Sequence, residues 1–371
     1  MNDLSISGAH LESRPSRALE TGLAVVVRAS ALLLPLAVAL GALRGGVATY
    51  VGVFVVFGLL SVVELVLGAT GISARSRPGD VDPKVVSWAA RAQLRVYAVG
   101  HMLVVPFALF EVSTGKLATW EIVGVGLSLA SMGGTVGGLG GHELFHQRNP
   151  IDRLLGVLVY GMFGYGHFAA GHIGGHHVNV GLRHDWGTAR RGETIYGFLY
   201  RAVVHGFVGG FRLEHARLRR AGHRGWSPAN LVVRCTLGTV AMFAGIYALG
   251  GLRLVAFHFV VSALTIAFME LFNYISHYAL VRPAAGRAAF VEYTWESDNK
   301  VVNWFIFNAG RHCHHHEKPA HAFDALRLFH AKAYIPYGIA LMAVVSFIPP
   351  LYLRKMNRIL DARSPGRNAA G

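Results

Sequence analysis

The chain has 371 residues, of which 53% are hydrophobic and 15% charged, and its mean hydropathy is +0.41. This charged content is far below the roughly 25% of ordinary soluble domains, so the composition excludes a soluble globular protein and indicates a membrane protein. The net charge of +15 does not predict nucleic-acid binding, because no recognised reading module accompanies it; a basic solvated or membrane-surface patch accounts for it. Cys235 and Cys313 do not have the spacing of a disulfide framework or an iron–sulfur cluster.

The chain is expected to form one membrane domain between two short tails. Residues 1–20 predict a polar N-terminal tail in the cytosol, and residues 364–371 predict a disordered C-terminal tail. The apolar stretch after the first tail is interrupted by Arg28, which fits a retained anchor better than a cleavable signal peptide. Neither a repeat nor a linker divides residues 21–363, which are therefore predicted to be the membrane domain.

Long apolar stretches predict the helices of this domain, since a helix that crosses a bilayer needs about 20 mostly apolar residues. Two shorter runs, Leu154–Ala170 and Ile335–Leu351, predict helices that lie at the interface or pack against the bundle. The expected fold class is an all-α integral membrane protein with six transmembrane helices. The predicted spans are Leu23–Leu43, Val47–Ala69, Leu94–Val112, Thr119–Leu139, Asn230–Gly250 and Leu252–Ile275.

Basic residues are distributed unequally between the two sides of the predicted bundle. The connections on one side carry one basic residue each, at Arg44, Lys116 and Arg253. The other side carries both tails and the arginine-rich segment from Arg148 to Arg224. Because positively charged loops remain in the cytoplasm, we expect both termini and this arginine-rich segment on the cytosolic side of a bacterial-type inner membrane.

Nine histidines, not counting the adjacent His314, fall into four short clusters, all on this expected cytosolic side. The clusters read His-Glu-Leu-Phe-His from His142, His-Ile-Gly-Gly-His-His from His172, Asn-Tyr-Ile-Ser-His-Tyr from Asn273 and Arg-His-Cys-His-His-His from Arg311. Residues four apart lie on one face of an α-helix, so such pairs can direct two imidazoles to one place. The spacing predicts three pairs: His142 with His146, His172 with His176, and His312 with His316.

Imidazole is a ligand for zinc, copper, iron and nickel, so the clusters predict a transition-metal centre. The first cluster alone also matches the His-Glu-x-x-His signature of zinc proteases. A catalytic zinc needs only three protein ligands, whereas two ions would use all nine histidines. His314 lies one residue off the shared face and is expected either to support the ligands or to lie at the surface. The isolated His10, His223 and His321 are expected to be solvated. The predicted ligands are His142, His146, His172, His176, His177, His277, His312, His315 and His316.

At these residues the chain resembles the membrane-bound alkane 1-monooxygenases of the AlkB type, within the fatty acid desaturase and hydroxylase superfamily. The resemblance runs from about Glu64 to Pro350 and implies a cytosolic cap with two non-haem iron ions. It also implies hydroxylation, with dioxygen, of a terminal carbon or methyl group in an apolar substrate that enters from the lipid. Two scattered cysteines cannot form a rubredoxin-like site, so a separate rubredoxin or ferredoxin and its reductase are implied. The matching segments are His142–Gln147, Gly171–His177, Asn273–Leu280 and Asn308–His316.

The chain departs from the family pattern beside the metal ligands. Phe145 replaces a glycine, Gln147 a lysine, Gly171 a glutamate and Ser276 a glutamate. Acids next to a metal site orient the bound imidazoles, so the loss of two of them implies either a retuned site or compensation from elsewhere. Glu270 shares a helix face with Asn273 and His277, and either supplies a displaced carboxylate or ends the span at the interface. The residues expected to support the ligands are Glu143, Asn273, Glu270 and Asp185.

Two further points concern the substrate. Gly52 and Val56 lie on one face of the second span and, with Phe145, are predicted to line a substrate channel; the alternative is that this face packs on a neighbouring helix. The alternative reaction is desaturation of an acyl or isoprenoid lipid, in which the product gains no oxygen. A membrane metal or haem carrier is disfavoured, because transporters place polar sites at the bilayer midplane.

Overall fold

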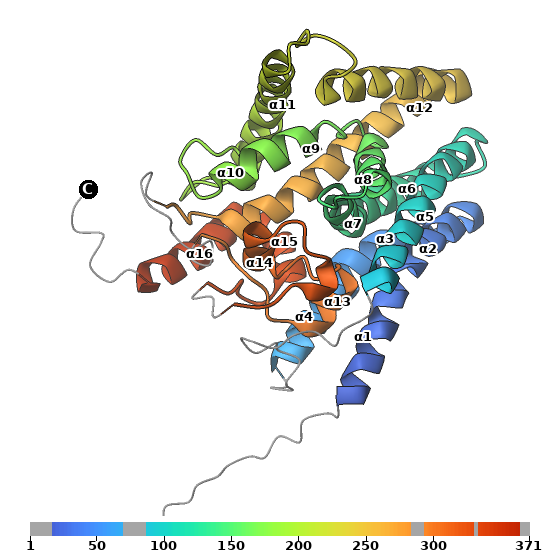
Figure 1. Cartoon of the computed structure of the whole chain (residues 1–371). Coiled ribbons are helices and arrows are strands. Elements are labelled where there is room, and N and C mark those ends of the chain that lie inside the picture. Colours follow the sequence, from blue (N-terminus) through green and yellow to red (C-terminus); the bar gives the residue numbers. More distant parts are fainter. Residues whose placement is uncertain (1–16, 70–86, 283–292, 330–332, 364–371) are drawn as a thin grey trace, which may run out of the picture.

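The computed structural model describes residues 17–69, 87–282, 293–329 and 333–363 (Figure 1). Within these ranges the regular elements are helices, and the one bridge between extended residues joins Glu296 and Tyr334. The all-α fold predicted from the sequence is therefore confirmed. Residues 1–16 and 364–371, which contain His10 and most of the two predicted tails, lie outside the described residues.

Five helical stretches of the described chain are long and apolar enough to cross a membrane, and they coincide with the predicted spans. Several consist of consecutive helical segments that continue into one another. They comprise α1 (Arg17–Ala31) with α2 (Leu33–Arg44); η1 (Gly46–Tyr50) with α3 (Val51–Val53), η2 (Phe54–Leu59) and α4 (Leu60–Ala69); α5 (Ser87–Ser113); α6 (Thr119–Met132) with η3 (Gly133–Gly137) and α7 (Gly138–Phe145); and α12 (Leu231–His277).

Helix α12 combines the last two predicted spans. Its 47 residues exceed twice the length of about 20 residues that one crossing needs. The helix is broken at Gly250 and Gly251, and Gly251 has φ 64° and ψ −161°, a conformation that glycine adopts without steric cost. Figure 1 shows two arms that meet at an angle at this break. The boundary predicted between the two spans therefore coincides with a real interruption.

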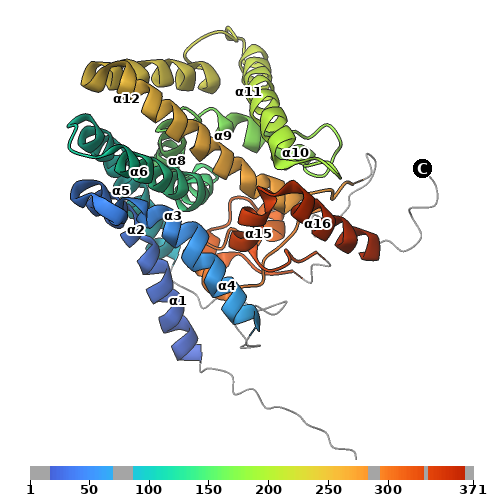
Figure 2. The same ribbon diagram turned by 180° about the vertical axis from the view of Figure 1, so that it is seen from behind.

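The connections between the long helices lie at one end of the molecule. Figures 1 and 2 both show the turn after α2, the turn between α5 and α6, and the break in α12 at the same end. The helices of the C-terminal region pack at the other end. This is the arrangement expected if the three weakly charged connections share one side of a membrane.

Five helices between residues 150 and 220, of which α11 is the longest, cover one flank of the candidate spans. They are α8 (Pro150–Gly161), α9 (Phe168–Gly171), η4 (His172–His176), α10 (His177–Asn179) and α11 (Ile195–Arg220). Helix α8 starts where the Asn149 side chain accepts hydrogen bonds from two backbone N–H groups of the first turn. It crosses α7 closely, because a Cβ atom on Gly156 would lie only 2.5 Å from the Gly141 carbonyl oxygen.

The C-terminal region closes the histidine end of the bundle. It contains α13 (Lys300–Phe305), α14 (His312–Glu317), η6 (Phe323–Ala325), α15 (Ile339–Ser346) and α16 (Pro349–Arg363). Helix α15 is buried against the bundle, and its first turn is capped from a distance by Glu64 of α4. The Glu64 carboxylate accepts hydrogen bonds of 2.8 Å from Ile339 N and 3.1 Å from Leu341 N. This cap satisfies N–H groups that a helix start leaves unpaired.

Candidate metal centre

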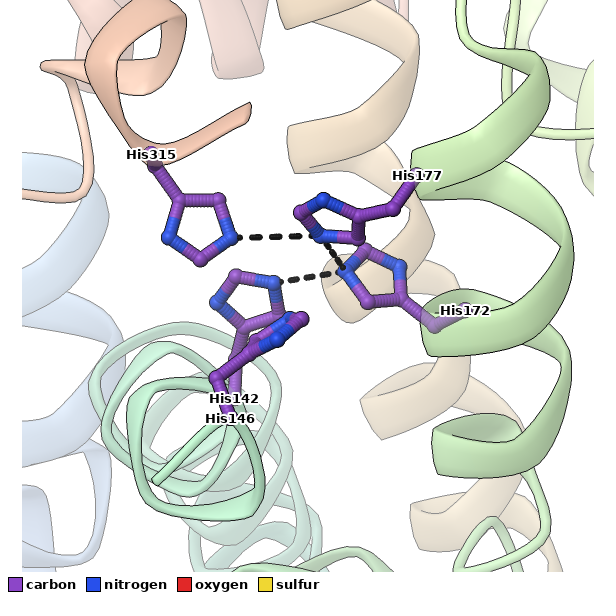
Figure 3. Close-up of side chains that lie close together, drawn as sticks. All are labelled: His142, His146, His172, His177 and His315. Carbon is purple, nitrogen blue, oxygen red and sulfur yellow. Dashed lines mark hydrogen bonds between the residues drawn. The ribbon is translucent and has the colours of Figure 1, made fainter. Parts of the chain in front are cut away.

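The nine predicted histidine ligands converge in two groups. In each group the candidate ligand nitrogens all lie within 4.8 Å of one another. Figure 3 shows the imidazoles of the larger group facing a common centre from opposite sides. We call the set His142, His146, His172, His177 and His315 the first group, and the set His176, His277, His312 and His316 the second group.

Each group is assembled from three parts of the fold. In the first group, α7 and the residue that follows it supply two histidines, the η4–α10 segment supplies two, and α14 supplies one. In the second group, η4 and the end of α12 supply one each, and α14 supplies two. Both groups therefore depend on the packing of segments far apart in the sequence. The η4–α10 segment and α14 contribute to both groups and link them.

The predicted pairing of His172 with His176 is wrong, whereas the pairs His142–His146 and His312–His316 are brought together as predicted. His172 belongs to the first group with His177, and His176 belongs to the second. The reason is that η4 is a π-helix, in which each turn holds more residues than an α-turn and positions five apart align. Such turns are frequent at functional sites. Here the wider turn directs neighbouring histidines to different groups.

The spacing of the imidazole nitrogens fits metal ions between them. In the second group, the Nε2 atoms of His277, His312 and His316 lie 3.0–3.2 Å from one another. Three neutral imidazoles that meet at their Nε2 atoms cannot satisfy each other well by hydrogen bonds, because each ring carries a single N–H. Two nitrogens bound at right angles to one ion, about 2.1 Å from it, would lie about 3.0 Å apart. A shared cation would produce this spacing, so the group could hold a metal ion.

The first group has the same compact geometry. His172 Nε2 lies 2.8 Å from His142 Nε2 and 2.9 Å from His177 Nε2. Burial, followed by the proximity of other imidazoles, keeps these rings neutral, which is the form that binds a metal ion. These causes lower the pKa of His315 to about 3. They hold the pKa well below its ordinary value in His146, His172, His177, His312 and His316.

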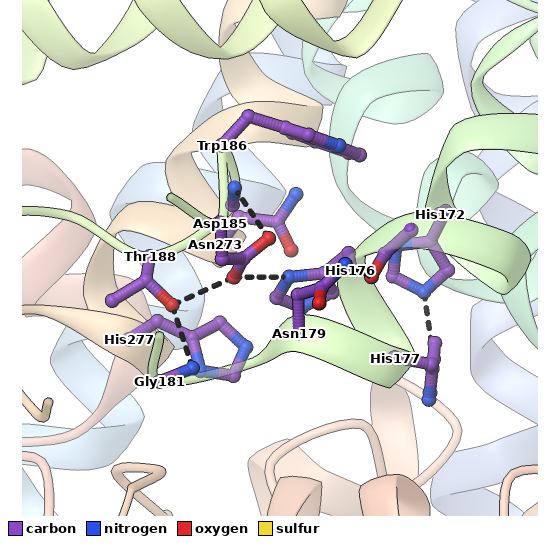
Figure 4. A network of polar contacts seen from close by, with 12 residues as sticks. His172, His176, His177, Asn179, Gly181, Asp185, Trp186, Thr188, Asn273 and His277 are labelled. Atoms are coloured by element: carbon purple, nitrogen blue, oxygen red, sulfur yellow. Dashed lines mark hydrogen bonds and ion pairs between the residues drawn. The ribbon is translucent and has the colours of Figure 1, made fainter. Parts of the chain in front are cut away.

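Asp185 lies where it can orient a ligand. Its Oδ2 atom is 2.8 Å from His176 Nδ1 and accepts a 2.7 Å hydrogen bond from Thr188 Oγ1 (Figure 4). Burial raises the pKa of Asp185, but the adjacent His176 imidazole and the two hydrogen bonds outweigh burial and keep that pKa below its ordinary value. A carboxylate in this position fixes the ring so that its other nitrogen faces the metal site.

The other predicted supporting residues are buried but form different contacts. Glu143 accepts a 3.1 Å hydrogen bond from Gln147 Nε2 on the next turn of the chain. Glu270 is fully buried, and α12 continues beyond it to His277. Its carboxylate accepts hydrogen bonds of 2.7 Å from the Tyr165 hydroxyl and 3.1 Å from Asn273 Nδ2. Within the described residues these two partners hold the Glu270 carboxylate, which therefore acts on Tyr165 and Asn273 and not directly on an imidazole.

His314 is not a surface residue, although it lies outside both groups. The side chain is buried, and its Nδ1 accepts a 2.9 Å hydrogen bond from the backbone N–H of Arg327. It therefore anchors the segment that follows α14. The isolated histidines His223 and His321 are exposed, as predicted.

Two adjoining cavities lie beside the histidine groups. The inner cavity is small and is bordered by His142 of the first group and His312 of the second. The outer cavity is larger and almost entirely apolar. The two cavities have three lining residues in common, Gly134, Leu139 and Phe272, so the apolar cavity leads toward the space between the histidine groups.

The predicted channel residues have different environments. Val56 lines the outer cavity. Gly52 packs against α6 instead, where a Cβ atom would lie 2.6 Å from the Ser128 carbonyl oxygen. Phe145 is buried against the rings of His142 and Tyr160. Leu139 and Phe272 were not predicted as lining residues, although Leu139 lies three residues before His142 and helical spacing alone places it on the same face.

Comparisons with known proteins agree with this geometry. The sequence profile of the family described as fatty acid desaturase matches residues 118–344. Alkane 1-monooxygenase 1 from Alcanivorax borkumensis is 30% identical over 320 residues, which cover 82% of this chain and 76% of that protein. An alkane 1-monooxygenase from Pseudomonas putida is 32% identical over 71% of this chain and 68% of its own length.

A more distant relative has a different substrate in its name. The xylene/toluene monooxygenase hydroxylase component from Pseudomonas putida is 26% identical over 66% of each chain. The profile match spans the segments that supply both histidine groups, and the named relatives are all monooxygenases. The chain therefore belongs to the family of membrane-bound alkane 1-monooxygenases, within the fatty acid desaturase superfamily.

Proposed function

We propose that this protein is a non-haem di-iron monooxygenase that hydroxylates an unactivated C–H bond. The observation that carries this proposal is the cavity that touches both histidine groups and continues into an apolar cavity. The overall reaction consumes one dioxygen, two external electrons and two protons, and yields one alcohol and one water. The C–H bond belongs to the terminal carbon of an alkane or alkyl chain, or to a methyl group, as the names of the relatives suggest.

The two histidine groups would each hold one iron ion. The first group offers five nitrogens and the second offers four, and an all-imidazole ligand set suits iron better than magnesium or calcium. When bound, the irons would activate dioxygen, while the protein would hold the substrate in position and exclude water. Asp185 holds His176 in the orientation that a ligand needs.

The side chains around the cavities determine what can reach the irons. The outer cavity is lined mainly by aliphatic and aromatic residues, including Val56, Leu60 and Ile339, and excludes water and charged groups. A hydrocarbon from the lipid gains free energy on entering such a space. Leu139 and Phe272, at the junction with the inner cavity, would hold the reacting carbon beside the histidines.

The electron donor is proposed to be a separate rubredoxin or ferredoxin with its reductase. Among the nine histidines, only His146 and His177 of the first group are partly exposed, whereas the second group is fully buried. Arg148 and Lys318 are exposed a few residues from ligands of the centre, and acidic carriers would approach such a surface favourably. We also propose that α12 crosses the membrane twice, giving six crossings, and that the histidine end and both termini are cytoplasmic.

Product analysis with labelled dioxygen tests the proposed reaction. Membranes that contain the chain, a rubredoxin and its reductase would be supplied with ¹⁸O₂ and either a linear alkane or xylene. The expected product is an alcohol that contains one ¹⁸O atom. Formation of an alkene without added oxygen would contradict hydroxylation.

Elemental analysis of the purified chain tests the proposed metal content. We expect about two irons per chain, since the nine imidazoles form two groups suited to iron. A chain with one zinc and little iron would contradict the di-iron centre.

A further inference from the structure

Arg201 of α11 has an unusually complete set of hydrogen bonds in a loop beside the second group. Its Nε and Nη2 donate bonds of 2.8 and 2.7 Å to the Glu193 carboxylate. Nη2 also donates to the Thr188 carbonyl oxygen at 2.9 Å, and Nη1 donates to the carbonyl oxygens of Asp185 and Trp186 at 3.4 and 3.1 Å. All five N–H groups of a guanidinium can thus be satisfied within one loop.

The loop from residue 181 to residue 194 that Arg201 holds is also joined to α12. The Tyr274 hydroxyl donates a 2.7 Å hydrogen bond to the Glu193 carbonyl oxygen. Ala279 N donates to the Ala189 carbonyl oxygen at 2.8 Å. Tyr274 and Ala279 lie three residues before and two residues after His277, a member of the second group. The loop therefore contacts the second group from two sides, through Asp185 on His176 and through the end of α12.

We propose that Arg201 is a positioning residue for the metal ion of the second group. It holds the backbone of Asp185 so that the carboxylate stays against His176 Nδ1 at 2.8 Å. This inference rests on the proposed two-metal centre. Lysine cannot replace arginine here, because its single ammonium cannot donate in the same planar fork to the four acceptor residues.

The proposed effect is specific to one of the two groups. Asp185 gives the second group a carboxylate partner, whereas in the described part of the chain no carboxylate hydrogen-bonds to a first-group imidazole. A loosened loop should therefore weaken the second metal site more than the first. Loss of a hydrogen-bond partner behind a metal ligand typically lowers metal affinity about 10–100-fold.

The test compares Arg201→Lys with Arg217→Lys in the full-length, iron-loaded chain in detergent. Arg217 is a matched control, because it lies on the same helix and also forms a two-pronged pair, with Glu214, but it is largely exposed. Iron release to a chelator would be followed over time, together with the thermal unfolding of the metal-free proteins. For Arg201→Lys we expect one iron to be released about 10–100-fold faster than in the parent, with the second iron retained. Arg217→Lys should release iron as the parent does.

A second variant separates positioning from general folding. Asp185→Asn, which keeps every hydrogen bond of Arg201, should give the same selective release of one iron and leave the melting temperature of the metal-free protein close to that of the parent. Equal acceleration for both irons, or unchanged release in Arg201→Lys, would overturn the role of Arg201. If Arg201→Lys does not accumulate, retention of both irons by Asp185→Asn would overturn it instead, and selective loss would support it. A parent protein without iron would overturn the proposed function itself.

Discussion

A neutral imidazole is the form that binds a metal ion and also the form that burial favours. At the residue scale, both conditions act on the same side chains. Burial and neighbouring rings hold the pKa of His146, His172 and His316 well below the ordinary value. The ligands are thus deprotonated before a metal arrives, so binding need not displace protons near neutral pH. As a consequence, the metal-free protein contains many buried imidazoles, and protonating them in the folded state is unfavourable.

The first prediction concerns pH. The folded pKa of these histidines lies below the unfolded value of about 6.5, so between the two values the unfolded chain binds more protons. The unfolding free energy of the metal-free protein should therefore fall as the pH drops below about 6.5. Thermal unfolding between about pH 7.5 and pH 5 would show a falling melting temperature. A melting temperature that stays constant over this range would mean that the histidines are already solvated.

The second prediction concerns individual ligands. Replacement of any one of the nine grouped histidines by alanine should abolish turnover, because each ring contributes a nitrogen to a shared centre. The exposed His223 provides the control, and His223→Ala should retain activity and iron content. Product formation and iron per chain would be measured together for each variant. Full activity in two or more of the nine alanine variants would show that the ligand set is misassigned.

At the scale of elements, helical periodicity predicted part of the centre and failed where the helix is not an α-helix. The spacing of four residues correctly paired His142 with His146, because α7 is regular. The same spacing misassigned His176, because η4 is a π-helix whose wider turn depends on the surrounding packing. The break in α12 was predictable, since paired glycines separated two stretches of span length. No local pattern indicates that Glu64 caps α15, since the two segments are 275 residues apart.

The third prediction concerns this cap. Glu64→Ala should lower the unfolding free energy by about 1–3 kcal/mol, because the buried N–H groups of Ile339 and Leu341 lose their acceptor. Glu64→Gln keeps one acceptor oxygen and should cost less. Thermal or denaturant unfolding in one detergent would measure the difference. Equal stability of the alanine variant and the parent would show that water replaces the carboxylate.

At the scale of the whole molecule, long-range packing determines which elements surround the outer cavity. The outer cavity combines residues from η2, α4, η3, α7, α12, α13 and α15. The face of the second span that holds Gly52 and Val56 was visible in the sequence, but its neighbour was not. The structure divides this face, because Gly52 contacts Ser128 of α6 while Val56 reaches the cavity. The periodicity of a single sequence shows which residues share one face of a helix. The element that packs against that face is determined by the tertiary fold.

The fourth prediction uses this division. Val56→Trp should fill part of the outer cavity and shorten the longest substrate that is accepted, while turnover of short substrates and iron content remain unchanged. Val62→Trp is the control, because Val62 is 54% exposed on α4 and faces away from the bundle core. Turnover would be measured across a series of alkanes of increasing length. A parallel loss of all substrates would identify Val56 as a packing residue.

The three residues common to both cavities limit which substitutions can change the substrate range of the enzyme. A residue that borders only the outer cavity, such as Val56 or Ala343, can be altered to admit another hydrocarbon without disturbing the histidines. Gly134, Leu139 and Phe272 border both spaces, and the Phe272 ring also lies edge-on to His312 at 5.0 Å between ring centroids. Any substitution there alters substrate fit and the surroundings of the metal together. Substitutions at the outer positions should therefore be the first to change which substrates are accepted. Substitutions at the three shared residues should change substrate selectivity and, at the same time, make the use of dioxygen less efficient.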